Sequence, residues 1–218
     1  MPNSPHQTSV DLLVLHTLRC MGYSTLDRIA AAARMSESEV ESELIDLAVD
    51  GLVIRTAGDF GGGWNLTDNG RAADEERIAG ELAESGAQAV ITRAFEDFLV
   101  LNPELLDLCS AWQMRPVDGV KRINDHTDSA YDARVLALFG EFHQRAEAVC
   151  AVLASGLARF DGYRVRLGAA LARAESGEPG HLTDRLDSYH TVWFQLHEDL
   201  LTTLRIPRDH PYRDDNNI

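Results

Sequence analysis

Hydrophobic residues recur at three- and four-residue steps along most of the chain, which predicts a mainly α-helical protein. The first such stripe predicts a helix over residues 9–21; its members are Val10, Leu13, Leu15, Leu18 and Met21. A short helix is predicted after Thr25, and a third one after Ser36. Glu39 follows Ser36 at the spacing of a capping box, and Gly51 is typical of the position just beyond a helix. Three helices are therefore expected in the first fifty residues.

Two β-like runs follow, LVIR from residue 52 and GWNL from residue 63, and the glycine-rich turn between them predicts a β-hairpin. Residues 1–70 are thus expected to form one unit of three helices and a hairpin. Residues 71–218 show no strand pattern and are expected to form a second, all-α domain. Within it the pattern predicts one long helix over 72–102, bent near Gly86, and another helix that begins at Pro103. A loop over 115–129 and further helices over 130–159, within 161–177 and within 184–205 complete the prediction.

The segment IAAAARMSESEVESELIDLAVDGLV, followed by GWNLTDNGR, resembles the winged helix of MarR- and PadR-type bacterial transcription regulators. The resemblance covers about the first third of the chain. It implies that the third helix enters the DNA major groove and that Asp59 to Gly63 form the tip of the wing. The DNA-contacting residues that it implies are Arg34, Ser36, Ser38, Glu39, Ser42 and Arg55. It also implies double-stranded DNA as a partner, and we expect a homodimer formed through the helix after Gly70.

The charge of the chain opposes this interpretation. The net charge is −15, and residues 1–80 hold six arginines, no lysine and 13 acidic residues, a net charge of −7. A module that binds phosphates normally concentrates cations. A glutamate can accept a hydrogen bond from cytosine, but the predicted third helix carries several acids and no base. A winged helix that contacts a protein instead of DNA therefore remains an alternative.

The second region mixes histidines with apolar stripes. His143, His190 and His197 lie on predicted buried helix faces, and Asp125 and His126 lie in the predicted loop. Three interpretations stay open: core histidines, a pocket for a small molecule, or a metal site. The candidate effector-binding residues are Trp112, Arg115, His126, His143, Tyr189, His190, Trp193 and His197. The seven-residue step from His190 to His197 separates the two rings by about 10 Å, so one ion does not bind both, and we predict neither metal nor cofactor.

Three strings in this region, LNPELLDLCSAWQMRP, NDHTDSAYD and DSYHTVWFQLHEDLL, are similar to those of actinobacterial proteins that carry winged helices. No P-loop, nucleophile elbow, zinc-protease motif or Rossmann glycine pattern is found, so no enzyme is predicted. Cys20, Cys109 and Cys150 are scattered and odd in number, which favours buried, reduced thiols and a cytoplasmic location. No apolar run reaches the roughly 20 residues of a membrane helix. The leading hypothesis is a DNA-binding transcription regulator whose helical domain binds a small-molecule effector. A protein-interaction module and a metal- or small-molecule-binding helical protein are the alternatives.

Overall fold

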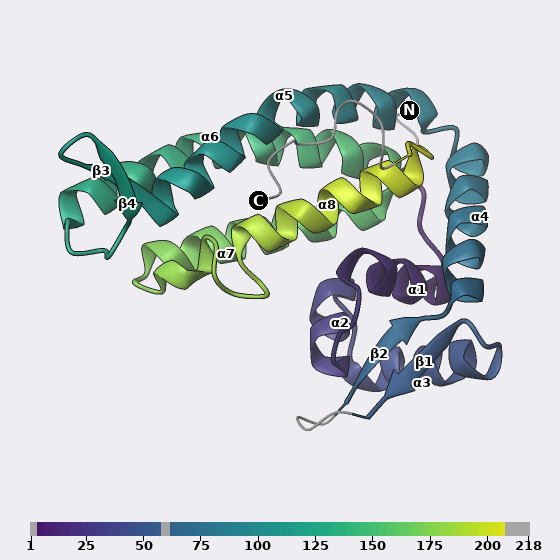
Figure 1. The fold of residues 1–218 in the computed structure, drawn as a ribbon. Coiled ribbons are helices and arrows are strands. Elements are labelled where there is room, and N and C mark those ends of the chain that lie inside the picture. The colour runs from purple at the N-terminus through teal and green to yellow at the C-terminus, as the bar shows by residue number, and fades with distance from the viewer. Residues whose placement is uncertain (1–3, 58–61, 208–218) are drawn as a thin grey trace.

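The computed structural model describes residues 4–57 and 62–207, and this part of the chain is mainly helical (Figure 1). The α-helices are α1 (Val10–Met21), α2 (Leu26–Ala33), α3 (Glu37–Val49), α4 (Asp68–Ser85), α5 (Gln88–Gln113), α6 (Ser129–Gly156), α7 (Asp161–Glu175) and α8 (Tyr189–Thr203). The strands are β1 (Val53–Thr56), β2 (Gly63–Leu66), β3 (Met114–Val117) and β4 (Val120–Ile123). Short 3₁₀ turns lie at Ala158–Phe160 and Pro179–His181. None of the described helices is both long enough and apolar enough to cross a lipid bilayer.

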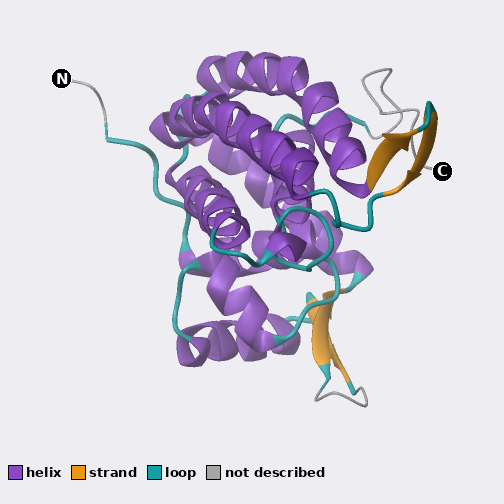
Figure 2. Ribbon diagram, turned by 90° about the vertical axis from the view of Figure 1, so that its left-hand side faces the viewer, coloured by secondary structure: helices purple, strands orange, loops and turns teal. Residues whose placement is uncertain are grey.

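The N-terminal unit has the predicted order of three helices and an antiparallel hairpin. The capping box at the start of α3 is confirmed: the Glu39 N–H donates to the Ser36 hydroxyl, and the Ser36 N–H donates to the Glu39 carboxylate. Gly51 follows the helix at a φ of +72°, a conformation that glycine adopts without steric cost. The β1–β2 hairpin packs against α3, and Figure 2 shows its strands in orange, projecting from the lower part of the molecule. Most of the expected wing tip, residues 59–61, lies outside the described residues.

The junction between the hairpin and α4 is tightly built. The Thr67 hydroxyl accepts the Gly70 N–H at 3.0 Å and donates to the Gly51 carbonyl at 2.7 Å. A Cβ at Gly70 would lie only 1.9 Å from the Leu52 carbonyl oxygen, so this position has room for glycine alone. The start of α4 is therefore fixed against the start of the hairpin.

The prediction of one helix over 72–102 and a second from Pro103 is wrong in both details. Gly86, at a φ of +64°, ends the first helix, and α5 begins anew at Gln88. Pro103 lies inside α5 instead of starting a helix. A proline in a helix interior loses one backbone hydrogen bond, and here the helix continues because Phe98 and Leu105 on either side of it are fully buried.

The predictions of an all-α second region and of a loop over 115–129 are also wrong. Strands β3 and β4 form an antiparallel hairpin around a turn in which Asp118 and Gly119 both have positive φ, 51° and 78°. Asp-Gly is a typical sequence for a two-residue hairpin turn. The strands lack an apolar alternation because charged, solvent-facing residues such as Lys121 and Arg122 fill them, so hydrophobic periodicity gives no signal here.

The helices α5 to α8 pack as a bundle, and α4 connects this bundle to the N-terminal unit (Figure 1). The β3–β4 hairpin lies at the end of the bundle that is remote from α4. The buried apolar side chains form two clusters, one drawn from residues between Val14 and Leu66 and the other from residues between Leu82 and Leu200. Polar and charged side chains are buried where α1, α4 and α8 meet. The proposed division of the chain at residue 70 stays a prediction.

Candidate functional site

The outward face of α3 is exposed along its whole length. Ser36, Ser38, Glu39 and Ser42, four of the predicted DNA contacts, are all solvent-accessible. The inward face carries the buried residues Val40, Leu44 and Leu47. The exposed side also bears large apolar side chains, namely Ile45, Val49 and, on the neighbouring strand β1, Ile54. The face that is free to contact a macromolecule is therefore acidic and partly apolar.

The two predicted phosphate-binding arginines differ in their surroundings. Arg34, at the C-terminal end of α2, donates to the Asp161 carboxylate of α7 at 2.9 Å. Arg55 on β1 is exposed, and its guanidinium carbon lies 5.9 Å from the centre of the Trp64 ring. Arg34 is thus directed toward the helical bundle, whereas Arg55 remains accessible.

Three of the eight predicted effector-binding residues gather at the β3–β4 hairpin. The Trp112 and His126 rings pack with centroids 4.8 Å apart, and His126 Nδ1 lies 2.9 Å from the Asp132 carboxylate. Arg115 donates to Asp125 at 2.8 Å. These contacts hold the hairpin against the end of the bundle, on the side that is remote from α3 (Figure 1).

The other five lie along the bundle. His143 Nδ1 and the Tyr189 hydroxyl share a hydrogen bond at 3.1 Å, and burial lowers the pKa of His143. The indole N–H of Trp193 donates to Asn102 at 2.9 Å. The remaining two are His197 and His190. The His197 ring packs against Phe98, and burial lowers the pKa of His190. The structure therefore does not bring the eight residues into one pocket, and a ligand at any of them stays a prediction.

A cavity with a volume of about 650 Å³ lies between the N-terminal unit and the bundle. Helix α2 forms one wall, α7 the opposite wall, and the segment 181–187 closes one side. Four arginines line it, Arg28, Arg166, Arg173 and Arg185, together with three aspartates, Asp27, Asp184 and Asp187. We call this cavity the α2–α7 cleft. None of the eight predicted effector-binding residues lines it.

Among the described residues, two of the four arginines, Arg28 and Arg166, have only neutral hydrogen-bond partners, whereas the other two lie beside a carboxylate. Arg173 and Arg185 both lie beside Asp187, at 3.5 and 3.6 Å. Arg28 instead donates to the Leu186 carbonyl at 3.2 Å, and Arg166 donates to the Gln195 side-chain oxygen. In the described part of the chain, no carboxylate lies within salt-bridge distance of either guanidinium. Burial lowers the pKa of Arg166, because the charged guanidinium is less well solvated there than in water.

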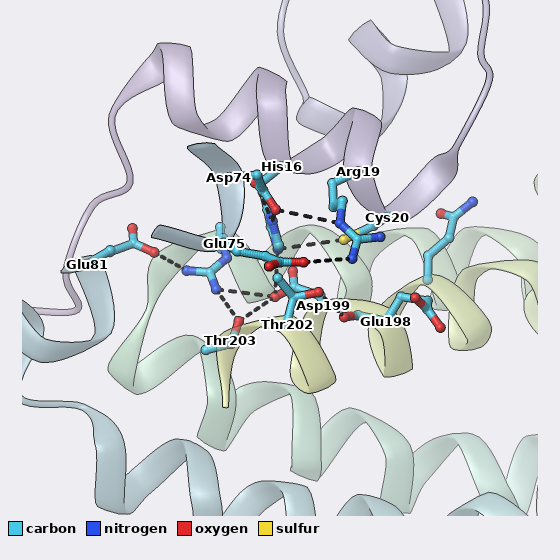
Figure 3. A network of polar contacts seen from close by, with 12 residues as sticks. His16, Arg19, Cys20, Asp74, Glu75, Glu81, Glu198, Asp199, Thr202 and Thr203 are labelled. Atoms are coloured by element: carbon cyan, nitrogen blue, oxygen red, sulfur yellow. Dashed lines mark hydrogen bonds and ion pairs between the residues drawn. The ribbon is translucent and has the colours of Figure 1, made fainter. Parts of the chain in front are cut away.

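A buried polar network lies beside this cleft and joins α1, α4 and α8 (Figure 3). His16 Nδ1 lies 2.9 Å from the Asp74 carboxylate, and His16 Nε2 lies 3.1 Å from the Asp199 carboxylate. The Cys20 sulfur is 3.6 Å from the same Nε2 atom. Burial works to lower the pKa of His16, but Cys20, Asp199 and Asp74 outweigh it, so the pKa lies well above its ordinary value.

Arg159 extends the network toward the end of α8. It pairs with Glu81 of α4, lies 3.2 Å from Asp199, and donates to the Thr203 hydroxyl at 2.6 Å. The Tyr163 hydroxyl donates to the second oxygen of Asp199 at 3.1 Å. Burial works to raise the pKa of Asp199, but Arg159 and His16 hold it well below its usual range.

Sequence reasoning missed both the cleft and the network. His16 and Cys20 lie four residues apart within the predicted first helix, where they share one face, so the sequence did contain a local signal. Asp199 likewise lies on the buried face of α8. The expectation that Cys109 and Cys150 are buried thiols is confirmed, and burial raises the pKa of each to about 12.

Comparison with known proteins gives no match for this chain among protein-family models, curated proteins or solved structures.

Proposed function

We propose that this protein is a ligand-responsive regulator, in which a small anionic molecule bound in the α2–α7 cleft controls a winged helix formed by α1 to α3 and the β1–β2 hairpin. The observation that carries the proposal is the pair Arg28 and Arg166. Their guanidinium groups line one cavity from two different units, and each has only a neutral hydrogen-bond partner. A carboxylate or phosphate would supply the missing charge.

The position of the cleft supports a regulatory role. Arg28 belongs to α2, which packs against α3, while Arg166 belongs to α7 of the bundle. An anion that contacts both guanidiniums binds best when the two units are docked as they are here. A ligand shifts an equilibrium only by its differential affinity for the two states. Contacts from both walls would provide such a difference, and α3 packs against α2.

For the output of the regulator, double-stranded DNA is the partner that the resemblance implies. Exposed serines along α3 and the accessible Arg55 on the adjacent hairpin support this assignment. The homodimer expected for a DNA-bound form is part of the same proposal. No catalytic step is assigned to the protein.

A protein partner is the second candidate, and three observations favour it. The exposed face of α3 bears acids and no lysine or arginine, and Arg34 is engaged with Asp161 instead of being free for phosphate. Ile45, Val49 and Ile54 add apolar area to the same side, and Val49 is 82% exposed. Apolar side chains flanked by acids suit a protein surface better than a phosphate backbone.

The output is tested by selecting genomic DNA fragments with the purified protein at low salt, followed by a salt titration of the best fragment. DNA binding predicts enrichment, a steep loss of affinity with salt, and weaker binding by Arg55→Ala than by the control Arg93→Ala, an exposed arginine on α5. Absence of enrichment at low salt would refute DNA as the output and leave the protein partner.

The sensor is tested separately by thermal unfolding in the presence of inorganic phosphate and a panel of small mono- and dicarboxylates. A ligand that binds the folded state stabilises it by about 2.7 kcal/mol at a concentration 100 times its Kd. We expect at least one of these anions to raise the unfolding temperature of wild type and Arg93→Ala. Arg28→Ala and Arg166→Ala should lose most of that increase. An increase that persists unchanged in both cleft variants, or no increase with any anion, contradicts the proposal.

A further inference from the structure

The network that joins α1 to α8 contains three side chains of the types that bind transition metals. They are His16 and Cys20 on one face of α1 and Asp199 on α8, all of them buried. Their ligand atoms lie within 4.8 Å of one another. We propose that these three residues bind a zinc ion, which would link the N-terminal unit to the helical bundle.

Two of the three distances between the proposed ligand atoms are close to those of a zinc tetrahedron, and the third is within 4.8 Å. Bond lengths of about 2.0 Å to nitrogen or oxygen and about 2.3 Å to sulfur place neighbouring N and S ligands about 3.5 Å apart, and N and O ligands about 3.3 Å apart. The structure has 3.6 Å between His16 Nε2 and Cys20 Sγ, and 3.1 Å between His16 Nε2 and Asp199 Oδ1. Two edges of the tetrahedron are therefore already formed by the protein.

The surroundings of His16 have the arrangement of a metal-bound histidine. Nε2 faces the other two ligands, and Nδ1 faces the Asp74 carboxylate at 2.9 and 3.2 Å. Metal-ligating histidines usually donate their second ring N–H to a carboxylate or carbonyl, which fixes the tautomer and the ring orientation. Asp74 would be such a positioning residue, which acts on the metal through His16.

A small cavity completes the site. It has a volume of about 30 Å³ and is bounded by His16, Cys20 and Asp199 together with Tyr163 and Arg159. This volume is sufficient for one water molecule. Three protein ligands and an open fourth position are the coordination that zinc adopts when it binds a water or an exogenous ligand. Arg166 lines both this cavity and the α2–α7 cleft, so the two cavities are neighbours.

The charge balance of the network permits the exchange of protons for an ion. The carboxylates of Asp74, Asp199 and Glu81 face Arg159, Arg19 and His16. A dication that takes the place of the proton on His16 Nε2 and of the thiol proton of Cys20 leaves the total charge unchanged. Arg159 Nη2 lies 3.2 Å from Asp199 Oδ1, the proposed ligand atom, and the Arg159 guanidinium also pairs with Glu81.

Titration with Co²⁺ tests the proposal, because cobalt occupies zinc sites and a cobalt–thiolate bond gives a charge-transfer absorption band. The tag-free full chain with reduced thiols is compared with Cys20→Ala and with the double variant Cys109→Ala/Cys150→Ala, in which Cys20 is the remaining thiol. We expect the band in wild type and in the double variant, saturating at one ion per chain and abolished by Zn²⁺. Cys20→Ala should lack the band while keeping the wild-type circular dichroism spectrum.

Two results would overturn the proposal: no band in wild type, or a band of equal strength in Cys20→Ala. If the double variant does not fold, the comparison of wild type with Cys20→Ala decides alone. Asp74→Asn adds a graded test, since loss of a supporting carboxylate weakens metal binding by about 10- to 100-fold. The anion screen on the cleft uses different residues, so either proposal can fail while the other stands.

Discussion

Replacement of Arg159 by methionine tests how strongly the buried network holds the structure together. The guanidinium is only 2% exposed and compensates two carboxylates, Glu81 and Asp199, which are 4% and 2% exposed. Methionine keeps the length and apolar stem of the side chain but removes the charge and the hydrogen bonds. Both carboxylates then remain buried without their principal cation. Breaking a buried ion pair in this way costs about 3–5 kcal/mol in the free energy of unfolding.

The control is Arg145→Met, because Arg145 also pairs with a carboxylate, Glu104, but does so on the surface. The two side chains are 50% and 43% exposed, and surface pairs contribute only about 0–1 kcal/mol. Urea unfolding followed by circular dichroism at fixed pH measures both variants. The double variant Arg159→Met/Glu81→Met should be less destabilised than the sum of its single changes, by about 0.5–3 kcal/mol. A loss for Arg159→Met no larger than that for Arg145→Met would refute the argument.

Two further predictions concern other parts of the fold. Gly70→Ala should destabilise the protein by about 1–3 kcal/mol or more, because the new Cβ would overlap a backbone carbonyl. Gly80→Ala in the same helix has open space and should stabilise the protein by about 0.5–1 kcal/mol. Urea unfolding measures both variants, and equal effects would contradict the packing described. Arg164 and Arg34 lower the pKa of Asp161, so these pairs stabilise the fold above the ordinary carboxyl pKa and lose their effect as the pH falls through the lowered value. Asp161→Asn should therefore reduce the dependence of the unfolding temperature on acid pH, and an unchanged dependence would contradict this expectation. If α3 binds DNA, the same variant should bind DNA more strongly, because Arg34 is released.

Hydrophobic periodicity predicted those helices that have one apolar face buried in the core and one polar face exposed to solvent. Helices α1, α3 and α8 have clear apolar stripes, and α3 also begins with a capping box. Their sequences therefore contain the information needed to predict them. The β3–β4 hairpin has no such information in its side-chain pattern, because its strands are short and charged. Only the turn pair Asp118–Gly119 marked it, and the prediction of a loop over 115–129 did not use that pair.

The sites depend on which helix faces meet, and periodicity does not report this. His16 and Asp74 are 58 residues apart in the chain, and nothing near either residue indicates the other. Arg28 and Arg166 look like ordinary surface arginines until α2 is placed against α7. The sequence pattern indicates Tyr189 and Trp193 as candidate effector-binding residues, and both side chains are buried in the structure. These aromatic side chains fill the core of the bundle, and a ligand at this position stays a prediction.

The segment before α1 is anchored to the helical bundle, and this limits how the protein could be recombined during evolution. The His6 backbone pairs with the end of α6, through its N–H to Gly156 at 3.1 Å and its carbonyl to the Ala158 N–H at 2.9 Å. The N-terminal unit is thus anchored to the bundle before α1 begins and again through α4. A recombination event that joined residues 1–70 to a foreign C-terminal partner would separate His16 from both of its carboxylates and leave His6 without its backbone partner. The two halves should therefore be inherited together, with substitutions in α1 compensated in α4 and α8, and not exchanged as independent modules.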